Sequence, residues 1–598
     1  MKKFSGAVAG VVASGVLAAV GPAIAADEVG VGLIEIEGAP IERPEPLAWL
    51  VGSSSPTLRQ LTDALESAAT RTDIDSVVLR LKDATLTATQ VEELARAIEK
   101  VREAGKPVSV YAYGYGTSEL LLGAAADKVL IQSGGAVSFP GLYMEEMFLG
   151  DTLRWAGLEP QLVQIGDYKG ASEPIMNAGP SDAWDENITQ LLDSLYANVR
   201  GHIREGRDMS DEELDEAMRV AWLADAETAI EVGLVDEAVD LPDLGGVVAD
   251  GADVRWVDDL VDDDGALSID PDDPMAFMKA YTQLLSLMSG PADAKPRGPT
   301  IAVLHIDGPI VDGKSASGGL FGGSNVGSLT IRKALEDIRD EPNVKGVIVR
   351  INSPGGSAIA SEVIWQGLRR VAETKPVWAS VGSMAASGGY YVAVGTDKIY
   401  VNESSIVGSI GVVGGKISPS ALMEKLKIHS VGRARGPMAG MFGSEAWNEE
   451  QLGLVREKMT ETYDLFVERV RAGRPGIDPS KTAEGRLFTG DKAIGLKMAD
   501  EVGSLDDAVG AMAEELGVAR YEVRDYPSPQ SLTEMLEEMF GGMASAPGVG
   551  AELAGPAAVV REMVGPEAWD AVRANLEGLM QLRHEPVLLM LPRVILVR

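Results

Sequence analysis

The amino-acid sequence repeats itself at a spacing of about 270 residues, and this repeat constrains the fold more than any other feature. Gly38 in VGLIEIEGAPI falls 270 positions before Gly308 in IAVLHIDGPIV. SVVLRL (76–81) and GVIVRI (346–351) are related by the same offset. Further pairs are KPVSVYA (106–112) with KPVWASV (375–381), and ADKVLIQ (126–132) with TDKIYVN (396–402). An offset held over a hundred residues indicates two copies of one domain.

Each copy alternates strands with helices. GVIVRI is a β-branched run of buried-strand length, residues 361–373 carry apolar side chains at helical spacing, and KPVWASV begins another strand. Such alternation favours a parallel sheet covered by helices. The sequence therefore predicts an α/β protein made of tandem duplicated domains with parallel sheets.

The chain ends and the connector between the copies differ in composition from the copies themselves. Lys2 and Lys3 precede a weakly apolar run and the triplet Ala23-Ile24-Ala25, a pattern typical of exported proteins. Residues 251–274 hold nine aspartates and favour a solvated acidic linker. We predict a signal peptide or signal anchor at 1–25, an N-terminal domain at 26–250, a linker at 251–298, a C-terminal domain at 299–525 and a tail at 526–598.

Composition excludes several classes of function. The chain has no cysteine, which rules out thiol nucleophiles, Cys-ligated zinc and iron–sulfur clusters. It has only four histidines and no HExxH motif, so we expect neither a metal nor a cofactor. A formal net charge of −37 repels phosphate backbones, and we expect no nucleic-acid partner.

The two copies differ where a reaction would need reactive side chains. The second copy carries VGSIG (407–411), with Ser409 between glycines, whereas the first has Phe139 at the matching position. Conversely, the first copy has Lys169 where the second has Arg435. Arginine does not lose its proton in any useful pH range, so only the first copy could supply a basic amine.

This division predicts a serine nucleophile activated by a lysine, with one member from each copy. Ser409 is the expected nucleophile and Lys169 the expected base. The lysine pKa must fall from about 10.4 toward about 7 to 8 for this role. Burial at a domain junction would lower it, because burial penalises the ammonium form.

Other residues of the second copy could support such a pair. Gly355 and Gly356 could turn backbone N–H groups toward a carbonyl oxygen. Gly388 opens a helix in a segment of small residues, and Ser430 precedes the segment that matches the lysine loop. We expect the glycines to help form an oxyanion hole and Ser430 to hold Lys169 by a hydrogen bond.

At these residues the chain resembles the long, duplicated form of the SppA signal peptide peptidases, also called protease IV. The family's nucleophile-loop motif is met at 408–411, with Val407 where threonine is usual, and its lysine motif at 168–174, with Gly170 in place of a serine. The SPGG and MAASGGYY segments also resemble the family, and the resemblance spans nearly all of residues 31–525.

The resemblance implies a ClpP/crotonase-like fold in each half and a serine endopeptidase with a Ser/Lys dyad. It also implies residual signal peptides and other unstructured hydrophobic peptides as substrates. The expected assembly is a homo-oligomer, a tetramer in the long form. It would lie in the bacterial periplasm or at the periplasmic face of the inner membrane, with membrane association possible.

Two alternatives remain at the level of sequence. In ClpP-type peptidases the nucleophile lies at the position that SMAASGG (383–389) resembles, so a ClpP-like or crotonase-like enzyme would use Ser387. A non-catalytic ring that only binds peptides is the other alternative. Export disfavours acyl-CoA chemistry, which is cytoplasmic, and the first alternative leaves Lys169 unexplained. A ring that only binds peptides would be expected to have lost a member of the dyad, whereas both members are intact.

Overall fold

A computed structural model describes seven stretches of the chain. They are residues 28–43, 55–261, 296–316, 324–436, 438–528, 587–590 and 596–597. The predicted signal segment, most of the predicted linker and most of the predicted tail lie outside these residues. The bounds of the five predicted segments stay predictions.

The first half is built on a seven-stranded sheet with the strand order β7-β4-β3-β2-β1-β9 and β8 paired to β4. Every pairing in it is parallel except that of β7 with β4. The strands are β1 (Val29–Glu37), β2 (Ser76–Lys82), β3 (Val108–Tyr115), β4 (Lys128–Val137), β7 (Ala224–Asp225), β8 (Glu237–Val239) and β9 (Val254–Val257).

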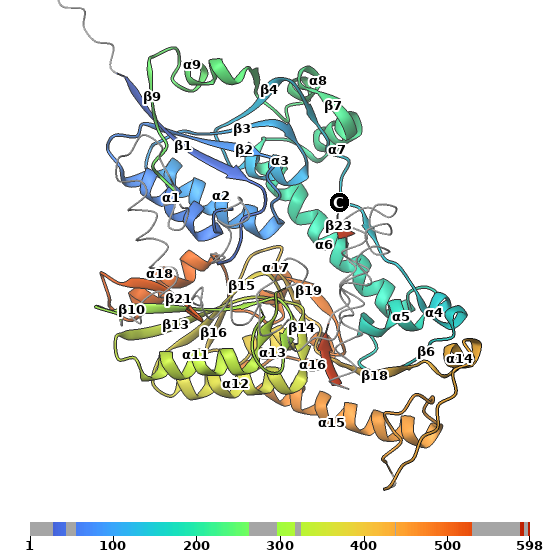
Figure 1. Ribbon diagram of the computed structural model, residues 1–598. Coiled ribbons are helices and arrows are strands. Elements are labelled where there is room, and N and C mark those ends of the chain that lie inside the picture. The colour runs from blue at the N-terminus through green and yellow to red at the C-terminus, as the bar shows by residue number, and fades with distance from the viewer. Residues whose placement is uncertain are drawn as a thin grey trace, which may run out of the picture.

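Helices cover both faces of this sheet, as Figure 1 shows. The helices of the first half are α1 (Leu58–Thr70), α2 (Ala88–Glu103), α3 (Thr117–Ala124), α4 (Gly150–Ala156), α5 (Glu173–Met176), α6 (Asp182–Gly206), α7 (Asp211–Val220), α8 (Ala226–Glu231) and α9 (Leu244–Val248), of which α4 and α5 lie beside β6 and not on this sheet. Leu61 of α1 and Leu94 of α2 pack on one face, and Leu244 of α9 packs on the other.

The second half repeats this plan in an eight-stranded sheet of order β19-β17-β15-β13-β10-β21, in which β16 pairs with β15 and β20. The strands are β10 (Thr300–Asp307), β13 (Val344–Ser353), β15 (Val377–Ala386), β16 (Lys398–Val401), β17 (Ile406–Gly408), β19 (Leu487–Thr489), β20 (Glu501–Val502) and β21 (Glu522–Tyr526). The helices are α11 (Ser328–Asp340), α12 (Ala358–Ala372), α13 (Gly388–Ala393), α14 (Ser420–Lys425), α15 (Glu449–Gly473), α16 (Pro479–Thr482), α17 (Gly490–Gly495) and α18 (Leu505–Glu515).

The central strands are apolar on both faces because helices cover both sides of the sheet. Val347, Ile348 and Val349 of β13 are all fully buried. Val347 and Val349 belong to the large core under α11, α12 and α13, whereas Ile348 packs beneath α18. The prediction of an α/β protein with two parallel-sheet halves is therefore confirmed.

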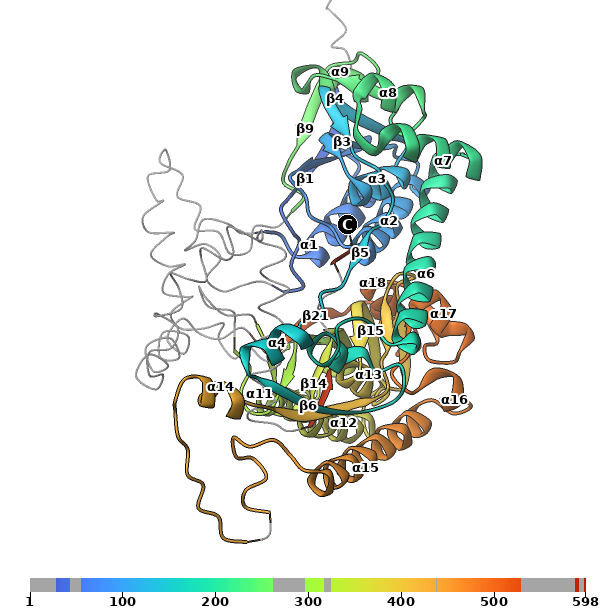
Figure 2. The ribbon, with the colours of Figure 1, turned by 90° about the vertical axis from the view of Figure 1, so that its right-hand side faces the viewer.

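A third sheet joins the two halves. Its order is β12-β11-β14-β22-β18-β6, with β12 (Val326–Gly327), β11 (Ile310–Val311), β14 (Gly355–Ser357), β22 (Val587–Met590), β18 (Val412–Ser418) and β6 (Glu159–Ile165). β6 belongs to the first half but pairs antiparallel with β18 of the second half along seven residues. Figure 2 shows α6, which follows the β6 segment, reaching from one half to the other. The first half thus extends a segment into the second half, and we call this segment, residues 159–169, the arm.

A buried ion cluster also holds the halves together. Arg350 of β13 donates to Glu93 of α2 at 2.8 Å and to Glu42 at 2.9 Å, and the arginine side chain is only 2% exposed. Asn402 donates to the same Glu93 oxygen at 2.7 Å. Burial raises the pKa of Glu93 despite the nearby guanidinium of Arg350. None of the helices in the described stretches combines the length and the apolar composition that a membrane crossing needs.

The cluster makes Arg350 a sensitive position for stability. Arg350→Met should lower the free energy of unfolding by about 3 to 5 kcal/mol, because it leaves a buried carboxylate without its cation. The loss should be larger at pH 8 than at pH 5, since protonation relieves the stranded charge of Glu93. Urea unfolding measures both effects. Arg332→Met, at a half-exposed arginine on α11, is the control and should change stability by less than about 0.5 kcal/mol.

Candidate active site

Lys169 lies at the tip of the arm, directly after β6, and its side chain is fully buried. Its Nζ lies within hydrogen-bond distance of three oxygens: Ser387 Oγ at 2.7 Å, Ser409 Oγ at 2.8 Å and the Ser409 carbonyl oxygen at 3.0 Å. All three oxygens belong to the second half. Folding thus brings together a lysine and two serines that are more than 200 residues apart.

No carboxylate compensates the buried amine. Burial lowers the pKa of Lys169 well below its ordinary value, and no nearby charge opposes that shift. Asp167 is exposed, and Glu173 instead accepts hydrogen bonds from the backbone N–H and hydroxyl of Ser181. The neutral amine, which can accept a proton, is therefore favoured over the ammonium form.

The segment 484–487 of the second half holds the lysine and serine loops against each other. The Tyr168 N–H donates to the Glu484 carbonyl at 2.8 Å, and the Ser409 N–H donates to the Arg486 carbonyl at 2.7 Å. A Cβ added to Gly485 would lie 2.4 Å from the backbone nitrogen of Lys169, and this glycine has a φ of +91°. Only glycine allows the two backbones to approach this closely.

Two residues of α6 support the same arrangement. A Cβ on Gly170 would lie 2.2 Å from the Trp184 ring, so the fully buried indole occupies the space that a side chain at position 170 would need. Asn187 accepts from the Leu487 N–H at 2.8 Å and donates to the Leu487 carbonyl at 3.1 Å. Sequence reasoning identified neither Trp184 nor Asn187. The only sequence feature that pointed to the indole was the glycine at position 170, where the family usually has a serine.

Ser387 occupies the turn between β15 and α13. Its φ of 52° and ψ of −111° lie outside the usual regions for a residue with a side chain. Its N–H donates to the Gly408 carbonyl at 2.8 Å, which fixes the turn against β17. A strained serine between a strand and a helix is the backbone form that presents a nucleophilic hydroxyl in several hydrolases.

Ser409 follows β17 and also has a positive φ of 52°. Its hydroxyl and its carbonyl both accept from Lys169, and its N–H is bonded to Arg486. A Cβ on Gly411 would lie 3.1 Å from the Lys169 side chain, so this loop also packs against the lysine stem. Ser409 therefore provides two hydrogen-bond acceptors to the Lys169 amine, its hydroxyl oxygen and its carbonyl oxygen.

The predicted supporting glycines lie on the Ser387 side of the lysine. Gly355 and Gly356 form β14, with φ values of 97° and 151°. A Cβ on Gly388 would lie 3.2 Å from the Gly356 nitrogen, so β14 approaches the residue next to Ser387. A Cβ on Gly356 would lie 2.0 Å from the Ile310 carbonyl oxygen, which restricts this position to glycine.

The structure does not bring Ser430 to this site. Ser430 is exposed on the segment after α14, and the acceptors of Lys169 Nζ are Ser387 and Ser409 instead. The expectation that Ser430 holds the lysine is corrected for this reason. Ser430 belongs to the second copy's own version of the arm, which extends away from the second half.

Comparison with known proteins decides the family. The model of peptidase family S49 matches residues 100–255 and 369–519, which together make up more than half of the chain. The chain belongs to peptidase family S49. As a member of this family it is a serine protease of the long, duplicated SppA type.

Curated relatives agree with this assignment. The chain is 27% identical over 533 residues to Protease 4 of Salmonella typhi, covering 86% of this chain and 83% of that protein. It is 27% identical over 475 residues to the chloroplastic serine protease SPPA of Arabidopsis thaliana, covering 78% and 67%. Among solved structures, a mutant of the 1510-N membrane-bound stomatin-specific protease in complex with a substrate peptide is 16% identical, with a TM-score of 0.25, and covers 41% of this chain and 98% of that one.

In this S49 peptidase, one short strand fills the space between the edges of β14 and β18, and we call this space the slot. β22, from the C-terminal tail, lies between β14 and β18 and pairs antiparallel with both. Met590 is opposite Gly355, Leu589 is opposite Gly356, and Leu588 is opposite both Ser357 and Val413. The two strand edges therefore accept a peptide backbone by strand addition.

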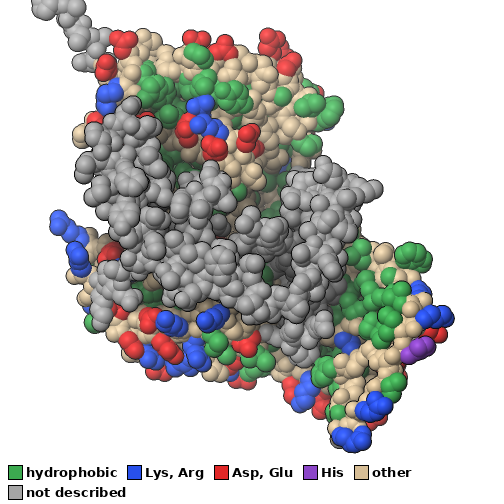
Figure 3. Space-filling model, viewed as in Figure 1, with side chains coloured by type: hydrophobic (Ala, Val, Ile, Leu, Met, Phe, Trp, Pro, Cys, Tyr) green, Lys and Arg blue, Asp and Glu red, His purple; other side chains and the backbone are tan. Residues whose placement is uncertain are grey.

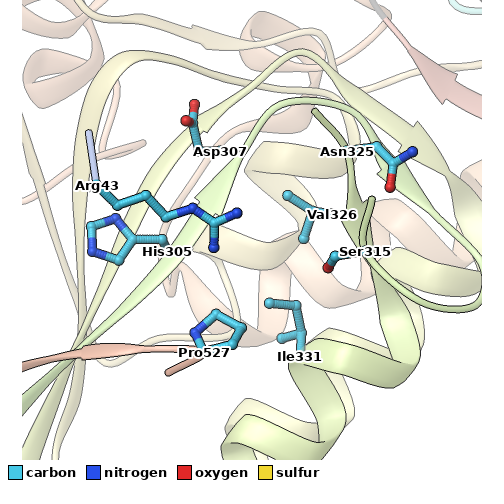
Figure 4. Close-up of a pocket in the computed structure, with 8 residues that line it drawn as sticks. All are labelled: Arg43, His305, Asp307, Ser315, Asn325, Val326, Ile331 and Pro527. Atoms are coloured by element: carbon cyan, nitrogen blue, oxygen red, sulfur yellow. The ribbon is translucent and has the colours of Figure 1, made fainter. Parts of the chain in front are cut away.

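A small pocket elsewhere in the second half is not part of this site. Arg43, His305 and Asp307 line it together with Asn325, as Figure 4 shows. The His305 Nε2 is 2.9 Å from an Asp525 oxygen, so this histidine is engaged away from Lys169. Among the described residues, no cluster of three or more histidine or carboxylate side chains could hold a metal ion.

The contact between Gly170 and Trp184 generates a test of the lysine loop. Gly170→Ala should lower the free energy of unfolding by about 1 to 3 kcal/mol and reduce peptidase activity, because the new methyl group displaces the loop that carries Lys169. Thermal unfolding and peptide hydrolysis measure the two effects. Gly179→Ala is the matched control, since a Cβ there meets nothing within 4 Å.

A double variant tests whether a steric clash with Trp184 causes that loss. Gly170→Ala combined with Trp184→Leu should recover part of the activity that Gly170→Ala loses, because the smaller side chain leaves room for the methyl group. Equal losses in the single and double variants would contradict a steric cause.

Proposed function

We propose that the protein is an endopeptidase in which Lys169 is the general base and Ser387 the nucleophile. The observation that supports this proposal most strongly is a fully buried lysine whose Nζ lies 2.7 Å from Ser387 Oγ and has no carboxylate partner. A buried lysine in a structural role would normally have a paired charge. The uncompensated amine therefore argues against a ring that only binds peptides.

Distance alone does not separate the two serines, and we favour Ser387 over the sequence-predicted Ser409 on backbone geometry. Ser387 lies at a strained strand-to-helix turn, and β14, which borders the slot, approaches the following residue. In Ser409, both the hydroxyl oxygen and the carbonyl oxygen accept hydrogen bonds from the Lys169 amine. In this arrangement Ser409 orients the lysine lone pair toward Ser387.

The reaction follows from these positions. Lys169 accepts the proton of the Ser387 hydroxyl while Ser387 Oγ attacks the carbonyl carbon of the peptide bond. The Gly356 N–H is the proposed donor to the oxyanion, with Gly355 and Gly388 shaping its approach. The lysine ammonium then gives its proton to the leaving amine. Water, deprotonated by the same lysine, releases the acyl group from the serine.

The slot supports extended, apolar peptides as substrates. In this chain the slot is filled by β22, the segment Val-Leu-Leu-Met, which pairs through its backbone with a strand on each side. A folded domain does not present such a strand, so unstructured chains are the fitting class. We propose that residual signal peptides are among them, in line with the resemblance to SppA proteases, and that the enzyme acts in the cell envelope as a homo-oligomer, with a tetramer as the expected size.

Single serine substitutions test the choice of nucleophile. Ser387→Ala should reduce hydrolysis of an unfolded protein or a peptide ester by about 10⁴-fold or more, because the attacking oxygen is gone. Ser409→Ala should cost about 10- to 100-fold, the contribution of a hydrogen bond to a catalytic amine. Initial rates of peptide hydrolysis distinguish them. If Ser409→Ala is the inactive variant and Ser387→Ala retains activity, Ser409 is the nucleophile.

The pH–rate profile tests the base. Activity should rise with pH through the lowered pKa of Lys169, because only the neutral amine accepts the serine proton. Lys169→Arg keeps the charge but cannot be neutralised, so it should be as inactive as Lys169→Ala. Arg435→Lys in the other copy should restore nothing to either variant.

A stability measurement separates lost chemistry from misfolding. Below its ordinary pKa, Lys169 binds a proton more readily when unfolded than when buried, so the stability it contributes rises with pH over that range. Lys169→Met removes this cost and should be inactive yet at least as stable as the wild type at pH 7. Substantial activity in Lys169→Arg would exclude lysine as the base.

A further inference from the structure

Beside the proposed base, an aromatic ring of the arm lies against an arginine of the second half. The Cζ atom of Arg486 is 3.9 Å from the centroid of the Tyr168 ring. Tyr168 directly precedes Lys169, and the carbonyl of Arg486 accepts from the Ser409 N–H at 2.7 Å. A guanidinium over a ring is attracted by the negative face of the ring. The Tyr168–Arg486 contact therefore joins the two loops that carry Lys169 and Ser409.

Arg486 is oriented by its own segment. Its Nη1 donates to the Ala483 carbonyl at 3.1 Å and to the Ser480 carbonyl at 3.4 Å. The same nitrogen is 3.3 Å from a Glu484 oxygen, and the arginine side chain is only 20% exposed. Figure 3 shows a different use of charge over α11 and α12, where acidic and basic side chains are interspersed on the surface. Because the guanidinium of Arg486 is already fixed, it loses little freedom when the ring covers it.

The ring of Tyr168 makes this contact, and its hydroxyl does not. The Oη is 3.5 Å from a Glu186 oxygen, which is the outer limit for a hydrogen bond. The backbone N–H of Tyr168 donates to the Glu484 carbonyl at 2.8 Å. One residue thus binds the second half twice, through its backbone and through its ring. A phenylalanine at this position would keep both interactions.

Glycines form the closest approach between the arm and the second half, and they provide no side chain to hold it. A Cβ on Gly485 would clash with the backbone of Lys169, and a Cβ on Gly166 would lie 2.6 Å from the Glu484 carbonyl carbon. Glycine backbones are also the most flexible. Side-chain packing beside these glycines must therefore come from neighbours, and the Tyr168–Arg486 contact supplies it.

The other copy has neither partner of this contact. Ala434 stands where the arm has Tyr168, and Trp222 stands where the second half has Arg486. The alanine directly precedes Arg435, which replaces Lys169. A contact that served only to join segments would be useful in both copies. Its presence beside the lysine alone links it to the lysine.

We propose that Tyr168 and Arg486 are positioning residues that hold Lys169 within reach of Ser387 and Ser409. The inference rests on the proposed function, in which the Lys169 amine accepts the serine proton. Without the contact, the end of the arm moves away from the second half and water reaches the amine. Burial is what lowers the pKa of Lys169, so exposure raises that pKa toward its ordinary value. At neutral pH fewer molecules then carry the neutral amine.

Substitution of Tyr168 tests this role through the pH–rate profile. Tyr168→Leu should lower kcat for peptide hydrolysis at pH 7 by about 10- to 100-fold, because a small displacement of a catalytic group is costly. It should also move the rising limb of the profile to higher pH. Tyr168→Phe keeps the ring and should match the wild type in both respects.

Tyr196 provides a matched control. Arg200 lies over its ring at 5.6 Å on α6, away from Lys169. Tyr196→Leu removes the same kind of contact and should leave the limb of the profile in place. A purely structural effect of Tyr168→Leu would likewise lower the amount of active enzyme without moving the limb, and that result would contradict the proposal.

A double-mutant cycle tests whether the two residues act through one contact. Arg486→Gln removes the cation and should lower kcat in the same range as Tyr168→Leu. The double variant should lose about as much as the more damaging single variant, because both changes remove the same contact. Losses that multiply would show that the residues act independently and would overturn the proposal.

Hydrogen exchange provides a readout that does not depend on activity. In the wild type, the amide protons of Tyr168 and Ser409 are bonded to carbonyls of the segment 484–487. Tyr168→Leu should speed exchange in peptides that cover 165–170 and 407–411, measured by mass spectrometry. Arg486→Gln should do the same.

The combination of the two readouts distinguishes this inference from the proposed function. Unchanged exchange in both loops of Tyr168→Leu overturns the positioning role, whatever the activity. Faster exchange in both loops with full activity and an unmoved pH–rate profile overturns the proposed function instead, because displacement of Lys169 would then not matter to the reaction. Faster exchange together with the moved limb supports both.

Discussion

The structure depends on the burial of one amine without a counter-charge. Lys169 Nζ is removed from water and meets only hydroxyl and carbonyl oxygens from the other half of the molecule. Such burial is unfavourable for an ammonium ion, so the surrounding fold must fix the lysine backbone firmly enough to keep the side chain in place. The pairing of β6 with β18, the close approach of Gly485 and the indole over Gly170 all act on that backbone.

The ion cluster around Arg350 plays a complementary part. It joins α2 of the first half to β13 and the loop before β17, close to where the serine loops begin. The halves are therefore held by the arm, by this buried charge and by further contacts such as the ion pair of Arg59 with Asp525. Relative rotation of the halves, which would separate lysine from serine, has to break several of these contacts.

The duplication made much of this predictable. Offsets between the copies revealed the two parallel-sheet halves, and the exchange of Lys169 for Arg435 singled out the proposed base without any knowledge of distances. The choice between Ser387 and Ser409 was not accessible, because it depends on φ and ψ at two turns and both hydroxyls reach the amine. Trp184 and Asn187 were equally hidden, since their partners Gly170 and Leu487 become neighbours only in the folded chain. Ser430 was misplaced because sequence alignment shows which segments correspond but not which half each one contacts.

The path of β6 has a consequence for the protein during its own synthesis. The proposed base, Lys169, is made early and lies in the first half, whereas Ser387, Ser409 and the segment 484–487 that contacts the Lys169 and Ser409 loops come much later. A chain that has folded only its first half contains a lysine in water with its proton in place, and no nucleophile. Proteolytic activity therefore begins only when nearly the whole chain has emerged and both halves have closed on each other, so the order of synthesis itself protects a growing chain and its neighbours from premature cleavage.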